Sequence, residues 1–218
     1  TEHKAILDPL DRLSRDGIKV NLLPVQQTAG VDAGLISPLQ IADAISDDTF
    51  LVSVMMANNE IGVIQPIAEI GKLCRERGVL FHTDATQAVG RLPVNVEELN
   101  VDLMSFSAHK IYGPKGSGAL YVRNKSVRLA AQIDGGGQEG GRRSGTLNPV
   151  GIVGLALALR LCNDELEQES LRLEGLRNRL WQGISSLENV LLNGPELANH
   201  VRLPGNLNCS FTDVDGEA

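Results

Sequence analysis

The sequence predicts an α/β fold with a mostly parallel sheet and helices on both faces, followed by the start of a smaller α+β domain. Apolar segments of strand length alternate along the chain with amphipathic segments of about a dozen residues, the pattern of successive strand–helix–strand units. The strand segments are apolar at consecutive positions, which is typical of parallel strands buried on both faces. We therefore expect ligand-binding residues at the carboxyl edge of this sheet.

Three helices are predicted in the first part of the chain, and each has a recognisable start or end. Residues 4–17 repeat apolar side chains at helical spacing and finish at a glycine. Residues 37–46 begin with Ser-Pro, in which the serine is the N-cap and the proline takes the first helical position. Residues 66–78 open with a proline and finish at a glycine.

Apolar runs between and after these helices are predicted as strands of the main sheet. They are residues 18–25, 50–56, 79–83, 101–107 and 118–122.

The C-terminal part is predicted to contain two helices and two short strands. The first helix, residues 149–162, begins after the N-cap Asn148. A second amphipathic helix is indicated by the spacing of leucine and isoleucine between residues 173 and 187. Residues 189–193 and 206–211 then form strands of a separate, smaller unit.

We predict the domain division inside this helical stretch. Residues 1–168 would form a large domain without its N-terminal part, and residues 169–218 the truncated beginning of a small domain. The chain starts at Thr1 rather than at methionine, and it stops shortly after an apolar, strand-like run. We therefore expect a fragment of a longer protein that lacks both ends and part of its active site.

Composition narrows the class of protein. Hydrophobic residues make up 42% of the 218 residues and no long polar tract occurs, so a packed core is expected rather than disorder. The formal net charge of −7 argues against nucleic acid or an anionic membrane as the main partner. No apolar run approaches the roughly 18 residues of a membrane span. The scattered cysteines lack a CxxC pair and fit a reducing compartment, so we predict a cytoplasmic protein.

A carboxylate and an amine follow two neighbouring predicted strands. Asp84 comes after the run 79–83 and Lys110 after the run 101–107, so both are expected to project beyond the carboxyl edge of the sheet. A lysine with a lowered pKa can carry a carbonyl cofactor, and a carboxylate can hold the proton of a pyridine ring. The pair therefore predicts a pyridoxal phosphate site. The alternative for Asp84 is an ordinary N-cap of residues 85–90.

Longer motifs around these residues resemble those of cysteine desulfurases. The similarity is to the nitrogen-fixation and iron–sulfur-cluster branch of the class V aminotransferase superfamily, whose members are fold-type I pyridoxal phosphate enzymes. It extends over nearly the whole chain and is carried by TEHKAILD, NNEIGVIQPI, HTDATQAVGRLPV, DLMSFSAHKIYGPKGSGALYVR and GGGQEGGRRSGTLNPVGIVGLALAL.

The resemblance implies a set of residues for the cofactor and substrate. The residues implied to bind pyridoxal phosphate are His3, Asp84, Gln87, Ser107, His109, Lys110 and Thr146. Lys110 would hold the cofactor covalently and His3 would stack on its ring, and these two are the implied catalytic residues. Asn59 would bind the carboxylate of the substrate.

The remaining implied contacts divide between the ring and the phosphate. Asp84 would pair with the pyridine nitrogen and Gln87 would hydrogen-bond the phenolic oxygen. Ser107 and His109 would bind the phosphate. Thr146 would reach the phosphate of the other subunit, which implies a homodimer.

Each assignment has a structural alternative. His3 lies near the chain end and could be frayed, and His109 could be an ordinary loop histidine. Asn58 and Asn59 could simply form a turn, and the segment GRRSGT could be a solvated basic loop. His82 next to Asp84 would suggest a metal, but no third ligand follows at a readable spacing, so no metal is predicted.

Two departures from the family pattern stand out. Ala108 occupies a position where glycine is common, which reduces backbone freedom. The family's nucleophilic cysteine is expected downstream of Ala218, and none of the chain's own cysteines, Cys74, Cys162 and Cys209, matches its motif. Cys74 and Cys162 are interpreted as core thiols. By itself this chain is therefore expected to be inactive.

The function implied is that of a cysteine desulfurase, which takes sulfur from L-cysteine, gives L-alanine and leaves an enzyme persulfide. An iron–sulfur scaffold or another acceptor protein would receive the sulfur. Two alternatives stay open. One is another class V enzyme, either a selenocysteine lyase or an aminotransferase. The other is a catalytically dead paralogue that acts as a binding partner in sulfur relay.

Overall fold

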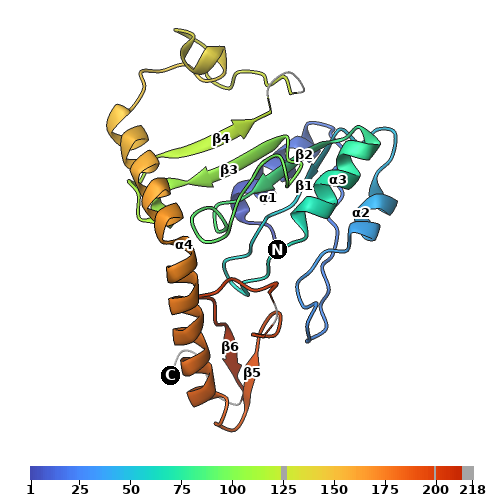
Figure 1. Ribbon diagram of the computed structural model, residues 1–218. Helices are drawn as coiled ribbons and strands as arrows, with labels where there is room; N and C mark the ends of the chain where they lie inside the picture. Colours follow the sequence, from blue (N-terminus) through green and yellow to red (C-terminus); the bar gives the residue numbers. More distant parts are fainter. Residues whose placement is uncertain (124–126, 199, 213–218) are drawn as a thin grey trace.

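The central sheet has four strands and is mostly parallel, as predicted. The computed structural model describes residues 1–123, 127–198 and 200–212. Within them the strand order is β1-β2-β3-β4. The pairs β1–β2 and β2–β3 are parallel, and β4 is antiparallel to β3 (Figure 1). The bounds are Leu51–Ser53 for β1, Leu80–Asp84 for β2, Leu103–Ser107 for β3 and Gly118–Val122 for β4.

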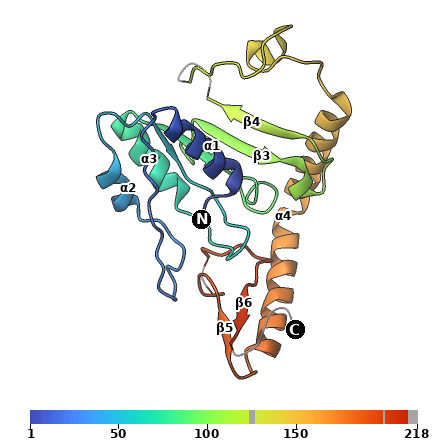
Figure 2. The ribbon, with the colours of Figure 1, turned by 180° about the vertical axis from the view of Figure 1, so that it is seen from behind.

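Helices lie on both faces of this sheet, which confirms the predicted fold class. The helices α2 (Pro38–Ala44) and α3 (Ile67–Arg77) are on one face, and α1 (Lys4–Arg15) is on the other (Figures 1 and 2). The end of α3 follows from its sequence, because Gly78 adopts a left-handed conformation with φ of 69°. Its N–H bonds back to the carbonyl of Cys74, as in a helix C-cap.

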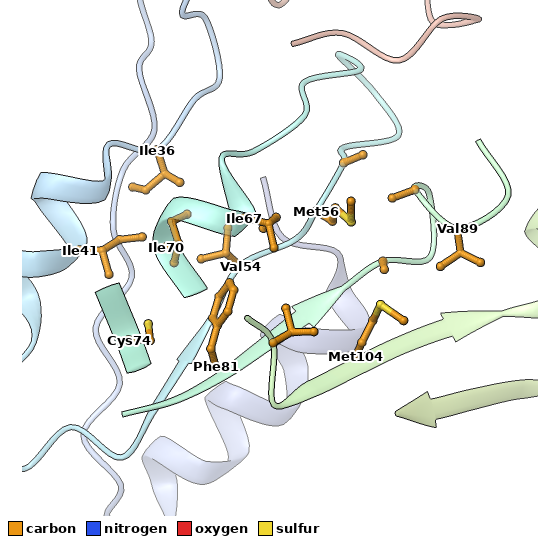
Figure 3. Packing of buried hydrophobic residues seen from close by; sticks show 14 of the residues in the cluster. Ile36, Ile41, Val54, Met56, Ile67, Ile70, Cys74, Phe81, Val89 and Met104 are labelled. Carbon is orange, nitrogen blue, oxygen red and sulfur yellow. The ribbon is translucent and has the colours of Figure 1, made fainter. Parts of the chain in front are cut away.

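The main hydrophobic core lies between β2, β1 and α3. Figure 3 shows the side chains of Ile67, Ile70 and Cys74 of α3 directed toward Phe81 of β2. Phe81, Ile70 and Cys74 are each fully buried. The spacing of the three α3 residues, three and four positions apart, places them on one helix face, which is why the helix packs on this side of the sheet.

The segment 18–25 was predicted as a strand, and this prediction is wrong. No strand is assigned to it, although its side chains Leu23 and Val25 pack against the core. A strand needs a neighbouring backbone, and none of the described residues pairs with this segment. The apolar pattern therefore correctly predicted that this segment packs against the core, but it did not predict whether the segment pairs as a strand.

A single long helix, α4 (Pro149–Ile184), replaces the two helices predicted for the C-terminal part. Asn148 caps it as predicted, because its Oδ1 accepts a hydrogen bond of 3.1 Å from the N–H of Gly151. The helix runs from the edge of the main sheet to a second sheet of two antiparallel strands, β5 (Val190–Leu192) and β6 (Cys209–Phe211) (Figure 1).

The helix α4 passes through residue 168 without a break, so the division at that position stays a prediction. Two short 3₁₀ helices complete the fold, η1 (Ala108–Ile111) after β3 and η2 (Gln138–Gly141) before α4. None of the helices in the described part of the chain is both long enough and apolar enough to cross a membrane.

Truncation of Phe81 tests the position of the core. Because Phe81 has no exposed surface, Phe81→Ala should lower the free energy of unfolding by about 3–5 kcal/mol. Phe50 is 59% exposed one strand away, so the matched change Phe50→Ala should have a much smaller effect. Urea unfolding of both variants measures the difference, and equal losses would contradict the assignment of the core.

Candidate active site

The ends of β2 and β3 bring the two predicted reactive residues to the same edge of the sheet. Asp84 is the last residue of β2 and pairs with Ser105 of β3. Lys110 is half-buried in η1, which begins directly after β3. Parallel strands end at one edge, so the carboxylate and the amine leave the sheet on the same side.

Asp84 both caps the following turn and keeps one oxygen unused. Its side chain is 5% exposed, and Oδ1 accepts a hydrogen bond of 2.9 Å from the N–H of Thr86. The N-cap alternative is therefore correct as a description of Oδ1. Within the described ranges Oδ2 accepts no hydrogen bond and is not fully buried, so this carboxylate oxygen is accessible to another donor.

A second carboxyl group, Glu2, approaches Asp84 and was missed by the sequence analysis. Its Oε1 accepts a hydrogen bond of 2.5 Å from the N–H of Met55, while Oε2 is buried without a partner in the described structure. Burial raises the pKa of Glu2, and the negative charge of Asp84 adds to this shift. In the sequence, the indication that Glu2 lies near the site was that it directly precedes His3, a predicted site residue.

Arg91 links Gln87 to the segment that carries Lys110. The guanidinium of Arg91 donates to Oε1 of Gln87 and, at 3.1 Å, to the backbone carbonyl of Lys110. Gln87 is 7% exposed, and its Nε2 donates no hydrogen bond to any described residue. Arg91 was also missed, although its spacing four residues after Gln87 fits two neighbours on one helical turn.

The adjacent asparagines have different environments. Asn58 is buried, and its Oδ1 accepts hydrogen bonds of 2.9 Å from the N–H groups of Glu60 and Ile61. Its Nδ2 donates to the carbonyl of Thr1 at 3.0 Å, which holds the chain start against this turn. The turn alternative therefore applies to Asn58, whereas Asn59 is exposed and lines a groove.

The other predicted residues are less tightly placed. His3 is exposed and caps α1, because its Nδ1 accepts a hydrogen bond of 3.1 Å from the N–H of Ala5. Ser107 is half-buried at the end of β3, and His109 is exposed in η1. Thr146 is exposed in the segment between η2 and α4, which projects beyond β4 (Figure 1). In the part of the chain that the structure describes, no hydrogen bond or ion pair joins Thr146 to the other predicted residues.

A groove of about 890 Å³ runs between the site and α4. Asn59, Gln87 and Arg91 line it from the sheet, and leucines such as Leu157 and Leu161 line it from the helix. The helix also contributes Glu165, Glu169 and Ser170, so both walls combine polar and apolar side chains, as is usual for a groove that binds a small polar ligand.

The two cysteines interpreted as core thiols are not activated nucleophiles. Burial raises the pKa of Cys74 to about 11, so this thiol stays protonated at neutral pH. Burial also raises the pKa of Cys162, and its Sγ lies 3.9 Å from the carbonyl of Ile111. Ala108 is fully buried and has no positive φ, so alanine in place of glycine introduces no backbone strain there.

Comparison with known proteins agrees with these features. The family model described as aminotransferase class-V matches residues 1–218. The chain belongs to the class V aminotransferase family. It is 53% identical over 219 aligned residues to cysteine desulfurase IscS from Salmonella paratyphi B and, equally, to that from Salmonella newport. The match covers 100% of this chain and 52% of each relative, so the chain spans about half the length of these curated relatives.

Solved structures of this family have the same fold. A NifS-like protein superposes with a TM-score of 0.91 at 39% identity, covering 99% of this chain and 57% of that protein. DndA from Streptomyces lividans gives a TM-score of 0.87 at 38% identity, covering 99% of this chain and 59% of that protein. A structure of SspA in complex with cysteine gives 0.78 at 35% identity, covering 96% and 56%.

Because the imidazole of His82 is partly buried beside Asp84, the free energy of unfolding should depend on its protonation. Its two ring nitrogens contact the hydroxyls of Ser53 at 2.8 Å and Ser105 at 3.2 Å. Burial lowers the pKa of His82 from its ordinary value of 6.5, and Asp84 opposes this with a smaller effect. Because the unfolded state binds the proton more readily, the free energy of unfolding should fall as the pH drops below about 6.5.

Urea unfolding between neutral and mildly acidic pH measures this slope. His82→Asn should reduce it, whereas the same change at the exposed His200 should leave it in place. A slope unaffected by His82→Asn would show that another group causes the acid sensitivity.

Proposed function

We propose that the whole protein is a pyridoxal phosphate-dependent cysteine desulfurase. The observation that carries the proposal is the buried carboxylate of Asp84 at the same sheet edge as Lys110, in a chain of the class V family. The similarity to relatives named cysteine desulfurase supports the choice of reaction.

Unused hydrogen-bonding groups of the site fit this cofactor. Asp84 and Gln87 are buried residues, but Oδ2 of Asp84 stays accessible as an acceptor for a ring N–H and Nε2 of Gln87 as a donor for a phenolic oxygen. In the described part of the chain, the side chains of Ser107 and Lys110 also make no hydrogen bonds. When bound, pyridoxal phosphate supplies an electron sink for negative charge that develops on the substrate.

The residues of this chain then divide the work. Lys110 holds the cofactor covalently and moves a proton at the substrate α-carbon, and Asp84 keeps the ring nitrogen protonated. Gln87, fixed by Arg91, donates to the phenolic oxygen. Ser107 and His109 bind the phosphate.

Two further assignments concern the partner subunit and the contact with the cofactor ring. His3, whose Nδ1 caps α1 at Ala5, would stack on the cofactor ring. Thr146 reaches the phosphate of a second copy, which makes the protein a homodimer. The segment between η2 and α4 that contains Thr146 projects beyond β4 (Figure 1), which is compatible with this assignment.

The proposed substrate is L-cysteine, with Asn59 binding its carboxylate. A thiolate outside the described residues attacks the substrate sulfur, the carbon–sulfur bond breaks, and the carbon keeps the electron pair and is protonated. The products are L-alanine and an enzyme persulfide, which passes sulfur to an iron–sulfur scaffold or another acceptor. The related SspA structure with cysteine supports this substrate class.

The first test concerns Lys110. Borohydride treatment of the cofactor-loaded whole protein should fix the cofactor to Lys110, and Lys110→Ala should abolish alanine formation. Lys115 is exposed five positions further on and is the matched control, so Lys115→Ala should retain activity. Peptide mapping that places the label elsewhere would reject the assignment.

The second test concerns Asp84. Because a buried ring proton would lose its partner, Asp84→Ala should cost about 3–5 kcal/mol in combined cofactor affinity and turnover. Asp102 is the control, since it is a half-buried carboxylate of the same sheet that accepts from the N–H of Phe81 at 3.0 Å. Cofactor titration and alanine production should be much less affected by Asp102→Ala. Near wild-type rates in Asp84→Ala would show that the ring nitrogen is bound by a residue other than Asp84.

A further inference from the structure

The loop that carries Asn59 is bound on one side by a segment from the far end of the chain. Val63 forms an antiparallel bridge with Arg202. The N–H of Ile64 donates to the carbonyl of Val201 at 2.7 Å, and the N–H of Leu203 donates to the carbonyl of Gly62 at 2.8 Å. The residues around 201–208 that lead into β6 therefore form one wall of this loop.

Two side chains of that segment contact the loop backbone beside Asn59. The amide of Asn208 donates to the carbonyl of Glu60 at 3.2 Å, and Asn206 makes the more extensive contact. Its Nδ2 donates to the carbonyl of Glu60 at 2.9 Å and, in a longer contact, to the carbonyl of Asn59 at 3.4 Å. These residues are 146 and 147 positions apart in the chain. A side-chain amide bound to two successive carbonyls restricts the orientation of the peptide between them.

The orientation of Asn206 is itself determined by a buried arginine. Nη1 of Arg202 donates to Oδ1 of Asn206 at 2.7 Å. Arg202 is 3% exposed, and its Nε donates to the carbonyl of Pro195 at 2.7 Å. Because the guanidinium can only donate, the oxygen of the amide must face it and the nitrogen must face the loop.

Gly62 leaves the space that this arrangement needs. A Cβ at this position would lie 2.4 Å from Oδ1 of Asn206, which is far inside contact distance. Gly62 also has a φ of +73°, a conformation that other residues rarely adopt. The loop is therefore shaped on one side by Asn58, which bonds its N–H groups, and on the other by Asn206, which bonds its carbonyls.

We propose that Asn206 is a positioning residue for substrate binding, which orients Asn59 toward the substrate carboxylate from the second structural unit. This inference rests on the proposed function, because it takes Asn59 as the residue that binds the carboxylate of L-cysteine. Asn206 touches the loop backbone and also lines the groove next to Asn59. Its loss should therefore weaken substrate binding more than it affects the cofactor or the chemical step.

Two variants of the cofactor-loaded whole protein test the proposal. Asn206→Asp keeps the shape and the bond to Arg202 but turns an oxygen toward the carbonyls, and Asn206→Leu removes both bonds without adding charge. Asn189→Asp is the matched control, because Asn189 is exposed in the same unit and its side chain makes no hydrogen bond to the loop within the described residues.

We expect both Asn206 variants to raise the KM for L-cysteine about tenfold with little change in kcat. Titration of the cofactor absorbance with L-alanine, which has the same carboxylate, should show a matching loss of affinity without turnover. Cofactor affinity should resemble that of Asn189→Asp.

The outcomes separate this inference from the proposed function. If the wild-type protein makes alanine but the Asn206 variants have the KM of Asn189→Asp, the positioning assignment is wrong and the function stands. A fall in kcat or cofactor affinity without a change in KM would likewise overturn it. If the wild-type protein carries no cofactor on Lys110 and makes no alanine, the proposed function fails first.

Discussion

Parallel pairing of β2 with both of its neighbours is the constraint on which the rest of the structure depends. It brings the carboxyl ends of three strands to one edge, so the backbone carbonyl of Asp84 can accept from Met56 at 2.9 Å while Asp84 pairs with Ser105. Alternation along β2 sends Phe81 to the core and Asp84 to the other face. A slip of one residue would exchange the two faces, burying the carboxylate in the core and exposing the ring.

The polar groups gathered at this edge would destabilise the fold if they were buried without partners. Hydrogen bonds to nearby residues reduce this desolvation penalty, since Asp84 accepts from Thr86 and Gln87 accepts from Arg91. Each of these side chains uses one polar atom for the protein and leaves another for a ligand. That division explains how a site can be rigid before a ligand is present, which reduces the entropy lost on binding. Glu2 is the exception, because its second oxygen is buried with no partner among the described residues.

The two structural units are joined in two different ways. The helix α4 is continuous from the main sheet to the second sheet, and residues 201–208 pack beside the loop that contains Asn59. The first connection sets the distance between the units. The second includes hydrogen bonds from Asn206 to the backbone carbonyls of Asn59, the proposed substrate contact, and Glu60. With the positioning role proposed for Asn206, a change in the second unit would alter substrate binding without altering the sheet.

The sequence by itself determined the fold class, most strands of the main sheet and the positions of Asp84 and Lys110 at strand ends, because periodicity and helix caps are local signals. It did not determine that residues 18–25 form no strand, or that α4 is continuous. Both depend on the neighbouring segments of the folded chain rather than on the local residues. The contacts of Glu2 with Met55 and of Asn206 with Glu60 were decided only by the tertiary structure. They join residues 53 and 146 positions apart, and no local pattern encodes a hydrogen bond that exists only after the intervening chain has folded.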